Sequence, residues 1–133
     1  MENNSTPMEL SAEDIKAGMN REKTVILASD NEAYNGKAVR VRALRASEFR
    51  RISAEVNITA KDASLGDLYA FNYKACSVRA TKNAPPAILT PGIIDLIDNM
   101  DADIINQIGD AIIAISKPNE EAVEDFSIAQ KGN

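Results

Sequence analysis

The sequence predicts a mainly α fold of the α+β class, in which a small N-terminal β-hairpin precedes a four-helix body that ends in a C-terminal αα-hairpin. Two short β-branched segments flank an Asn-Gly turn, and the rest of the chain carries Ile and Leu at helical spacing. A length of 133 residues leaves room for one core. We expect a flexible arm over residues 1–10, a single α+β domain over residues 11–127 and a flexible tail over residues 128–133.

The first third of the chain predicts one short helix and two paired strands. Their ranges are 12–20 for the helix and 23–28 and 37–44 for the strands. Ser11 precedes an Ala-Glu-Asp run, which is typical of a helix N-cap. The Asn35-Gly36 pair favours a turn between the strands. The second strand alternates, with Val39 and Val41 on one face and the polar side chains on the other.

Four later segments predict the helical body. Their ranges are 47–56, 64–81, 91–100 and 102–116, followed by one or two acidic turns over 120–126. Ser47 is expected to cap the first of these helices, and Ser64 or Asp62 the second. Thr90-Pro91 supplies an N-cap and a first helical residue for the third. Because the helix over 64–81 is apolar on more than one stripe, we expect it to be central.

The predicted core is aliphatic, because aromatic residues make up only 5% of the chain. Its expected members share either the apolar face of the second strand or one stripe of a helix. They are Val39, Val41, Leu44, Phe49, Ile52, Leu68, Phe71, Ala75, Ile93, Ile97, Ile104, Ile108 and Ile112.

Residue types absent from the chain exclude several kinds of catalytic and metal site. The sequence has no His, so a His-based triad or a His general base is excluded. Cys76 is the only cysteine, which excludes an internal disulfide and a multi-Cys metal site, and fits a cytoplasmic setting. We expect Cys76 to be a buried apolar residue. The six glycines match no phosphate-binding loop, so we expect no enzyme, cofactor or metal.

Aspartates are concentrated in the last two predicted helices. They are Asp95, Asp98, Asp101, Asp103 and Asp110. Paired carboxylates can carry out acid–base hydrolysis. The same pattern is explained without catalysis if the aspartates form a polar helix face and stabilise a helix start, and we favour that interpretation. An EF-hand loop counted from Asp101 is excluded, since Ile105 would occupy a ligand position.

Charge is segregated along the chain, which has a formal net charge of −5. Residues 37–82 hold ten Lys or Arg and four Asp or Glu, whereas residues 83–133 hold two and nine. Within the basic third, a basic stripe over residues 37–51 is predicted, formed by Lys37, Arg40, Arg42, Arg45, Arg50 and Arg51. Arg40, Arg42 and Arg45 are its candidate partner-binding residues. The stripe could bind nucleic acid, receive an acidic partner or pair with the acidic last third of the same fold. Because the whole chain is acidic, nucleic acid is the less favoured of these readings.

The last two predicted helices contain more Ile than one core face needs. On ideal α-helices Ile94 and Ile113 lie away from the main apolar stripes. They are either buried against the helix over 64–81 or form a partner-binding or oligomer surface. The sequence leaves both readings open.

The order of elements resembles a known family. The segments that carry the likeness are "KAVRVRAL", "ASEFRRI", "AFNYKACSV", "APPAILTPGIIDLI" and "IINQIGDAIIAIS", followed by an acidic tail. This arrangement resembles the small tail assembly chaperones of long-tailed phages and prophages over roughly residues 23–127. The likeness rests on element order and hydrophobic rhythm, and it does not include the N-terminal arm.

The resemblance implies a non-enzymatic protein of the host-cell cytoplasm, acting in virion morphogenesis. Its implied partners are the tape measure protein, which the chaperone keeps soluble, and the tail tube protein, which polymerises around it. Self-association into a homo-oligomer stays open, as does the alternative of a small nucleic-acid-binding or regulatory module that uses the basic stripe. No membrane association is expected, since no apolar run approaches the length of a bilayer span.

Overall fold

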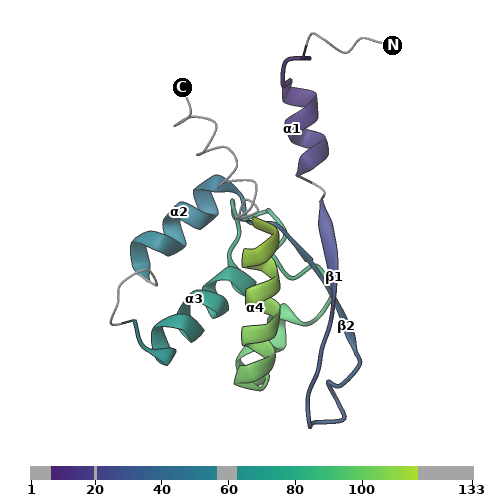
Figure 1. Cartoon of the computed structure of the whole chain (residues 1–133), viewed down its shortest axis with the longest axis vertical. Helices are drawn as coiled ribbons and strands as arrows, with labels where there is room; N and C mark the ends of the chain where they lie inside the picture. Colours follow the sequence, from purple (N-terminus) through teal and green to yellow (C-terminus); the bar gives the residue numbers. More distant parts are fainter. Residues whose placement is uncertain (1–6, 20, 57–62, 117–133) are drawn as a thin grey trace, which may run out of the picture.

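The computed structural model describes residues 7–19, 21–56 and 63–116, which form a mainly α fold with one β-hairpin (Figure 1). The predicted fold class is therefore confirmed. The elements are α1 (Ala12–Gly18), β1 (Glu22–Ile26), β2 (Ala38–Arg42), α2 (Ala46–Glu55), α3 (Leu65–Ser77), the 3₁₀-helix η1 (Ile94–Asn99) and α4 (Ala102–Ser116). The turns expected over 120–126 and most of the terminal arm and tail lie outside the described residues.

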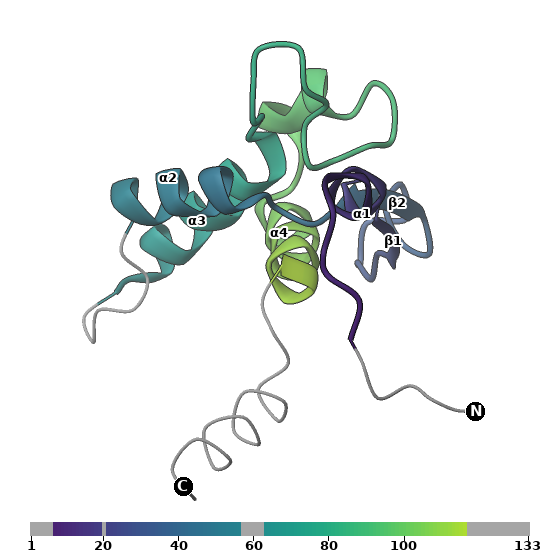
Figure 2. The ribbon, with the colours of Figure 1, turned by 90° about the horizontal axis from the view of Figure 1, so that it is seen from above.

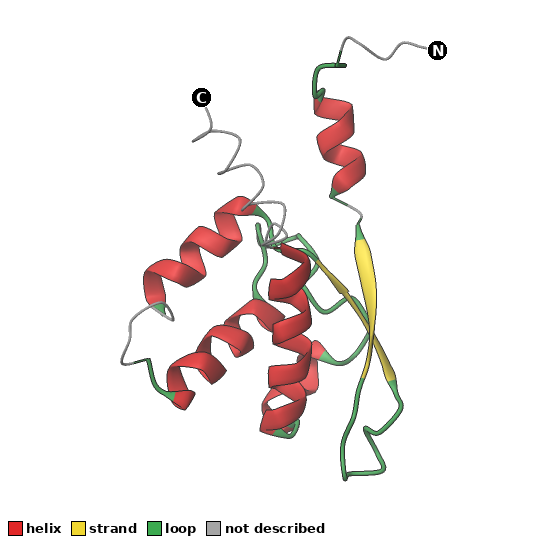
Figure 3. Cartoon of the chain, viewed as in Figure 1, coloured by secondary structure: helices red, strands yellow, loops and turns green. Residues whose placement is uncertain are grey.

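The two strands form an antiparallel ribbon, drawn in yellow in Figure 3. The register runs from Glu22 opposite Arg42 to Ile26 opposite Ala38. The outer edge of β2 is paired with a later segment, because Arg42 donates its N–H to the carbonyl of Ala87 at 2.9 Å. β2 is therefore the middle of three adjacent chain segments.

Helix α4 is the centre of the molecule. In Figure 2 it lies between the pair α2–α3 and the hairpin. Four of its side chains are completely buried, namely Ile104, Ile105, Ile108 and Ile112. Its last residue, Ser116, accepts the N–H of Leu44 at 2.7 Å and so joins the end of α4 to the end of β2. The helix expected to be central was the one over 64–81, but α3 packs chiefly against α2 and α4, whereas α4 packs against α3 and both strands and so takes the central place.

Helix starts at α1 and α3 follow the predicted signals. Ser11 and Asp14 form a reciprocal capping box at α1, and Ser64 and Asp67 form another at α3. The predicted cap at Ser47 is wrong. α2 begins at Ala46, with Arg45 as its N-cap residue, because the Glu48 carboxylate accepts the Arg45 N–H at 2.8 Å.

Helix α3 ends four residues before the predicted end. Val78 leaves the helix in an extended conformation and is buried in the core. Arg79 then donates to the carbonyl of Ala84 at 3.1 Å and closes the connecting loop. The loop begins early because its later part, around Ile88, must return to the edge of β2.

The predicted α-helix over 91–100 is a 3₁₀-helix that starts later, at Ile94. Two residues explain the difference. Thr90 does not cap a helix, since its hydroxyl accepts the Arg40 N–H at 2.8 Å. Gly92 has a φ of 85°, which interrupts a right-handed helix. The C-terminal αα-hairpin is therefore a 3₁₀-helix joined to α4.

Most of the predicted core is confirmed. Ten of its thirteen members are buried: Val39, Val41, Leu44, Ile52, Phe71, Ala75, Ile97, Ile104, Ile108 and Ile112. Phe49 and Ile93 are half-buried. The assignment of Leu68 to the core is wrong, since its side chain is 42% exposed. The core also includes Leu27, Ala87 and Ile88, which the sequence patterns did not single out. No helix among the described residues is long and apolar enough to cross a bilayer.

Candidate binding groove

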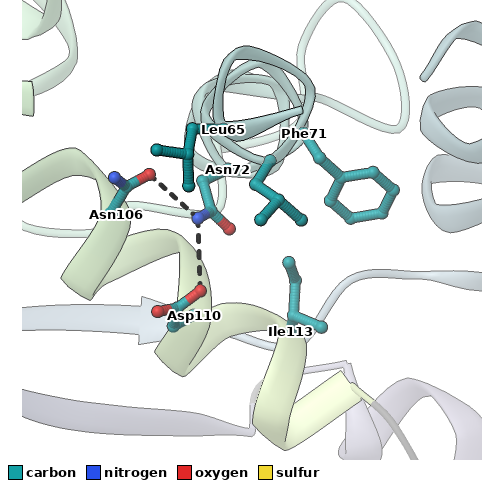
Figure 4. Close-up of a pocket in the computed structure, with 7 residues that line it drawn as sticks. Leu65, Phe71, Asn72, Asn106, Asp110 and Ile113 are labelled. Atoms are coloured by element: carbon teal, nitrogen blue, oxygen red, sulfur yellow. Dashed lines mark hydrogen bonds between the residues drawn. The ribbon is translucent and has the colours of Figure 1, made fainter. Parts of the chain in front are cut away.

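An open groove of about 410 Å³ lies between residues 65–72 of α3 and residues 106–113 of α4. Figure 4 shows its lining from both helices. The lining residues are Leu65, Leu68, Phe71, Asn72, Asn106, Asp110 and Ile113. One wall is apolar and the other carries two amides and a carboxylate, which is the composition of a binding groove.

Two large apolar side chains of this groove are uncovered. Leu65 is 86% exposed and Leu68 is 42% exposed. They are one turn apart on α3 and therefore lie on one face of the helix. Ile113 reaches the same groove from α4 and is half-buried. Together the three aliphatic side chains form an apolar surface between two helices.

The polar wall is fixed by Asn72, which is buried in the helix interface. Its Nδ2 donates to Asn106 Oδ1 at 3.0 Å and to Asp110 Oδ1 at 3.2 Å. Both amide hydrogens are used by these bonds, and in Figure 4 its Oδ1 turns towards the apolar side chains. The groove thus combines aliphatic surface with one oriented carbonyl acceptor.

The polar wall depends on Gly109, which sequence reasoning missed. A Cβ placed on Gly109 would lie 2.5 Å from the Cβ of Asn72. Only glycine allows α3 and α4 to approach this closely at Asn72. The sequence did contain a signal for this close approach, namely an isolated Gly in the middle of a strongly periodic, Ile-rich helix.

Of the two predicted isoleucines, Ile113 lines the groove and Ile94 does not. Ile94 is half-buried against the core. The physical reason is the 3₁₀ geometry of η1, in which residues three apart share a face. Ile94 therefore shares a face with the buried Ile97, and the exposed large apolar side chain of η1 is Leu96.

The predicted basic stripe is not continuous. Arg40 is exposed and forms an ion pair with Glu22 at 3.5 Å. Arg42 is only 2% exposed, so the expectation that it shares an open polar face with Arg40 is wrong. Arg45 is half-buried at the start of α2. Arg40 pairs with Glu22 and Arg42 pairs with Glu48, so neither forms an ion pair with the acidic segment over residues 83–133.

Arg42 forms a buried, two-pronged ion pair with Glu48. Its two terminal nitrogens lie 2.8 Å from the two carboxylate oxygens. The same guanidinium donates to the carbonyls of Ala43 and Pro85. Burial raises the pKa of Glu48, but the hydrogen bond from Arg42, the Arg45 N–H and both guanidinium charges lower it, and the net direction is down. The pair joins β2, α2 and the loop before residue 87.

The predicted aspartate cluster does not converge on one point. Asp98 accepts the hydroxyl of Tyr73 at 2.6 Å, which raises the pKa of that tyrosine. Asp101 accepts the side-chain amide of Asn31 at 3.3 Å, and Asp110 accepts that of Asn72. Among residues 7–19, 21–56 and 63–116, no group of His, Cys, Asp and Glu is arranged to hold a metal ion.

Cys76 is buried as expected. Its Sγ lies 3.8 Å from the carbonyl oxygen of Ile105, in the interface of α3 and α4. Burial, with a smaller contribution from the charge of Asp110, raises the pKa of the thiol to about 12. The thiol is therefore protonated at neutral pH, and a protonated thiol is a poor nucleophile.

Comparison of the chain with protein-family models, with curated proteins and with solved structures finds no match.

Proposed function

We propose that this protein is a non-enzymatic tail assembly chaperone of a long-tailed phage or prophage, acting in the host-cell cytoplasm. The proposal is that it binds the tape measure protein and assists polymerisation of the tail tube protein around it. Two things support the proposal. The order of elements resembles that family, and the groove between α3 and α4 offers uncovered aliphatic surface to a partner.

The groove is the observation that carries the proposal. A protein that keeps a long, aggregation-prone helical chain soluble must offer apolar surface bordered by polar groups. Leu65, Leu68 and Ile113 would contact the apolar stripe of a partner helix laid between α3 and α4. Asp110 and the amides of the polar wall would border that helix.

The nucleic-acid alternative is less well supported. A phosphate-binding stripe needs several exposed cations in a row. Arg42, in the middle of the predicted stripe, is buried against Glu48, and Arg40 forms a surface ion pair with Glu22. No second function is therefore proposed.

The test is co-expression with the tape measure protein of the same phage. We expect the wild-type chain to raise the soluble yield of tape measure fragments and to co-purify with them. The double variant Leu65→Asp/Leu68→Asp should lose both effects while keeping its melting temperature, because both side chains are largely exposed.

The matched control is Ala54→Asp, which adds a charge to an exposed position of α2 outside the groove. It should behave as wild type. Unchanged capture by the double variant, or equal loss in the control, would contradict the assignment of the groove. Failure of the wild-type chain to bind any tape measure fragment would contradict the proposed function itself.

A further inference from the structure

A second groove, of about 350 Å³, lies between the loop of the β-hairpin and the segment that contains η1. We call it the hairpin–η1 groove, and it shares no lining residue with the α3–α4 groove. Its aliphatic and aromatic lining residues are Leu27, Ala33, Tyr34, Ile93, Leu96 and Met100. The side chain of Leu96 is 60% exposed, so the apolar lining reaches the surface of the molecule. Exposed apolar surface inside a groove is typical of a contact site for another molecule.

The walls of this groove are held in place by the chain itself. Gln107 of α4 donates from its Nε2 to the carbonyl of Ala28 at 2.7 Å and accepts the Ala28 N–H on its Oε1 at 3.0 Å. Asp101, just before α4, accepts the side-chain amide of Asn31 at 3.3 Å and donates its N–H to the hydroxyl of Tyr34 at 3.4 Å. These bonds fix the hairpin loop against the start of α4. A partner therefore meets a preformed surface and does not have to order the loop.

The hairpin backbone at Leu27 and Ala28 offers no edge for an added strand. The N–H of Leu27 donates to the carbonyl of Lys37 at 2.9 Å, and its carbonyl accepts the N–H of Gly36 at 2.8 Å. Both backbone groups of Ala28 are bonded to Gln107. A partner can therefore contact this groove only through side chains, as an amphipathic helix does when it lies in an apolar groove.

The segments that frame the groove are acidic. Residues 27–37 and 91–103 contain six Asp or Glu and a single Lys, a formal net charge of −5 that equals that of the whole chain. The six carboxylates, which we call the acidic rim, are all exposed and belong to Asp30, Glu32, Asp95, Asp98, Asp101 and Asp103. Over residues 7–19, 21–56 and 63–116, none of them takes part in an ion pair. The rim therefore outweighs the one cation of the lining, Lys37.

We propose that the hairpin–η1 groove binds a basic amphipathic helix of another protein. Aliphatic side chains of that helix pack against Ile93, Leu96 and Met100, and its Lys or Arg side chains lie beside the acidic rim. Charge complementarity of this kind selects the partner and speeds association more than it adds affinity. An acidic helix would be repelled by the rim. The inference is independent of the proposed function, which rests on the α3–α4 groove.

The first test measures binding of a labelled model peptide to the full chain by fluorescence anisotropy. The peptide has about 18 residues, above the length at which isolated helices are marginal, with Leu on one helix face and Lys on the other. One control peptide has Glu in place of Lys, and the other has its Leu and Lys rearranged so that neither face is apolar. We expect only the amphipathic Lys peptide to bind, with an affinity that falls as salt is added. No binding of this peptide, or equal binding of either control, would overturn the proposal.

The second test locates the peptide on the protein. Leu96→Ser removes an exposed apolar side chain of the groove and should weaken binding at least about tenfold, as expected for the loss of one buried Leu contact. Leu65→Ser is the matched control, since it makes the same exchange at an exposed Leu of the α3–α4 groove, and it should bind as wild type does. Both variants should keep the wild-type melting temperature, because neither side chain is in the core. Equal affinity of the two variants would show that the peptide does not bind in the hairpin–η1 groove.

The third test separates the acidic rim from the overall charge of the protein. Glu32→Gln/Asp95→Asn neutralises two carboxylates next to lining residues, whereas Glu9→Gln/Glu13→Gln neutralises two at and before α1. Both double variants change the net charge by the same amount. We expect the first to weaken binding and to reduce its salt dependence, and the second to do neither. Equal effects would mean that the peptide responds only to net charge, which contradicts the proposal.

Light scattering tests a second copy of this chain as the occupant of the groove. We expect wild type and Leu96→Ser to have the same solution mass at every protein concentration. Self-association that is lost in Leu96→Ser and kept in Leu65→Ser would assign the groove to a homo-oligomer and overturn the proposal.

Discussion

Gly109 of α4 lies directly against Asn72 of α3, with the Cβ, Cγ and Oδ1 of Asn72 all within 2.7 Å of where a Gly109 side chain would begin. This contact sets the separation of the two helices that frame the α3–α4 groove. It also holds Asn72 within hydrogen-bond distance of Asn106 and Asp110. One missing methyl group therefore determines both the packing and the polar wall.

Gly109→Ala should destabilise the protein. Forcing a methyl group into this contact costs about 1–3 kcal/mol, and the better helix propensity of Ala offsets up to about 1 kcal/mol of that. A net loss of unfolding free energy is expected in urea denaturation. Gly66→Ala in α3 is the control, because its nearest neighbour, Ser64 Oγ, would be 3.5 Å away. Equal stability of the two variants would show that the helices separate without cost.

Arg42→Met should be strongly destabilising, by about 3–5 kcal/mol, because it leaves the Glu48 carboxylate buried without its charged partner. The double variant Arg42→Met/Glu48→Leu removes both charges and should recover part of the loss. Urea denaturation of the two single variants and the double variant gives the coupling energy. Additive losses in this cycle would mean that the two side chains do not stabilise each other.

Acid should weaken the fold partly through Glu48. Its pKa in the folded protein lies below the ordinary value of 4.5. A lowered folded pKa means that ionised Glu48 stabilises the fold above about pH 4.5, and that this stabilisation is lost as the pH falls through the folded pKa. The unfolding free energy of wild type should therefore fall more steeply below that pH than that of Glu48→Gln. Parallel curves for the two proteins would contradict this assignment.

Cys76 should be unreactive in the folded protein. With its pKa raised to about 12 and its side chain buried, the thiol is neither ionised nor accessible at pH 8. A coloured thiol reagent should label it only as denaturant unfolds the protein, with the same midpoint as circular dichroism. Ser53→Cys, at an exposed position of α2, provides the exposed-thiol control and should add one rapidly labelled group. Fast labelling of native wild type would place Cys76 outside the core.

Hydrophobic spacing was enough to predict the class of the fold and most of its core. The alternation at Val39 and Val41 identified β2, and the Ile spacing identified α4, because the burial of each element follows its own backbone period. The same alternation placed Arg42 on an open face. It could not show that α2 and the loop at Pro85 cover Arg42, since alternation within a strand does not reveal which later segment packs against its polar face.

The candidate site was less predictable than the fold. Ile113 was singled out by its surplus position on α4, whereas Leu68 was assigned to the core because it fits the apolar pattern of α3. Periodicity does not reveal where a neighbouring helix ends or how deep a groove is. Ile94 was placed away from the apolar stripe for another reason, since a helix of three residues per turn changes which residues share a face.

The hydrogen bond between Leu44 and Ser116 has a consequence for synthesis on the ribosome. The element at the centre of the core is the last one described along the chain, and the strand it closes on precedes it by 72 residues. Until α4 has left the exit tunnel, the hairpin and the α2–α3 pair lack the helix that lies between them. The nascent chain must therefore hold the apolar faces that α4 covers in solution until residues 102–116 have emerged, and packing of the core follows that step.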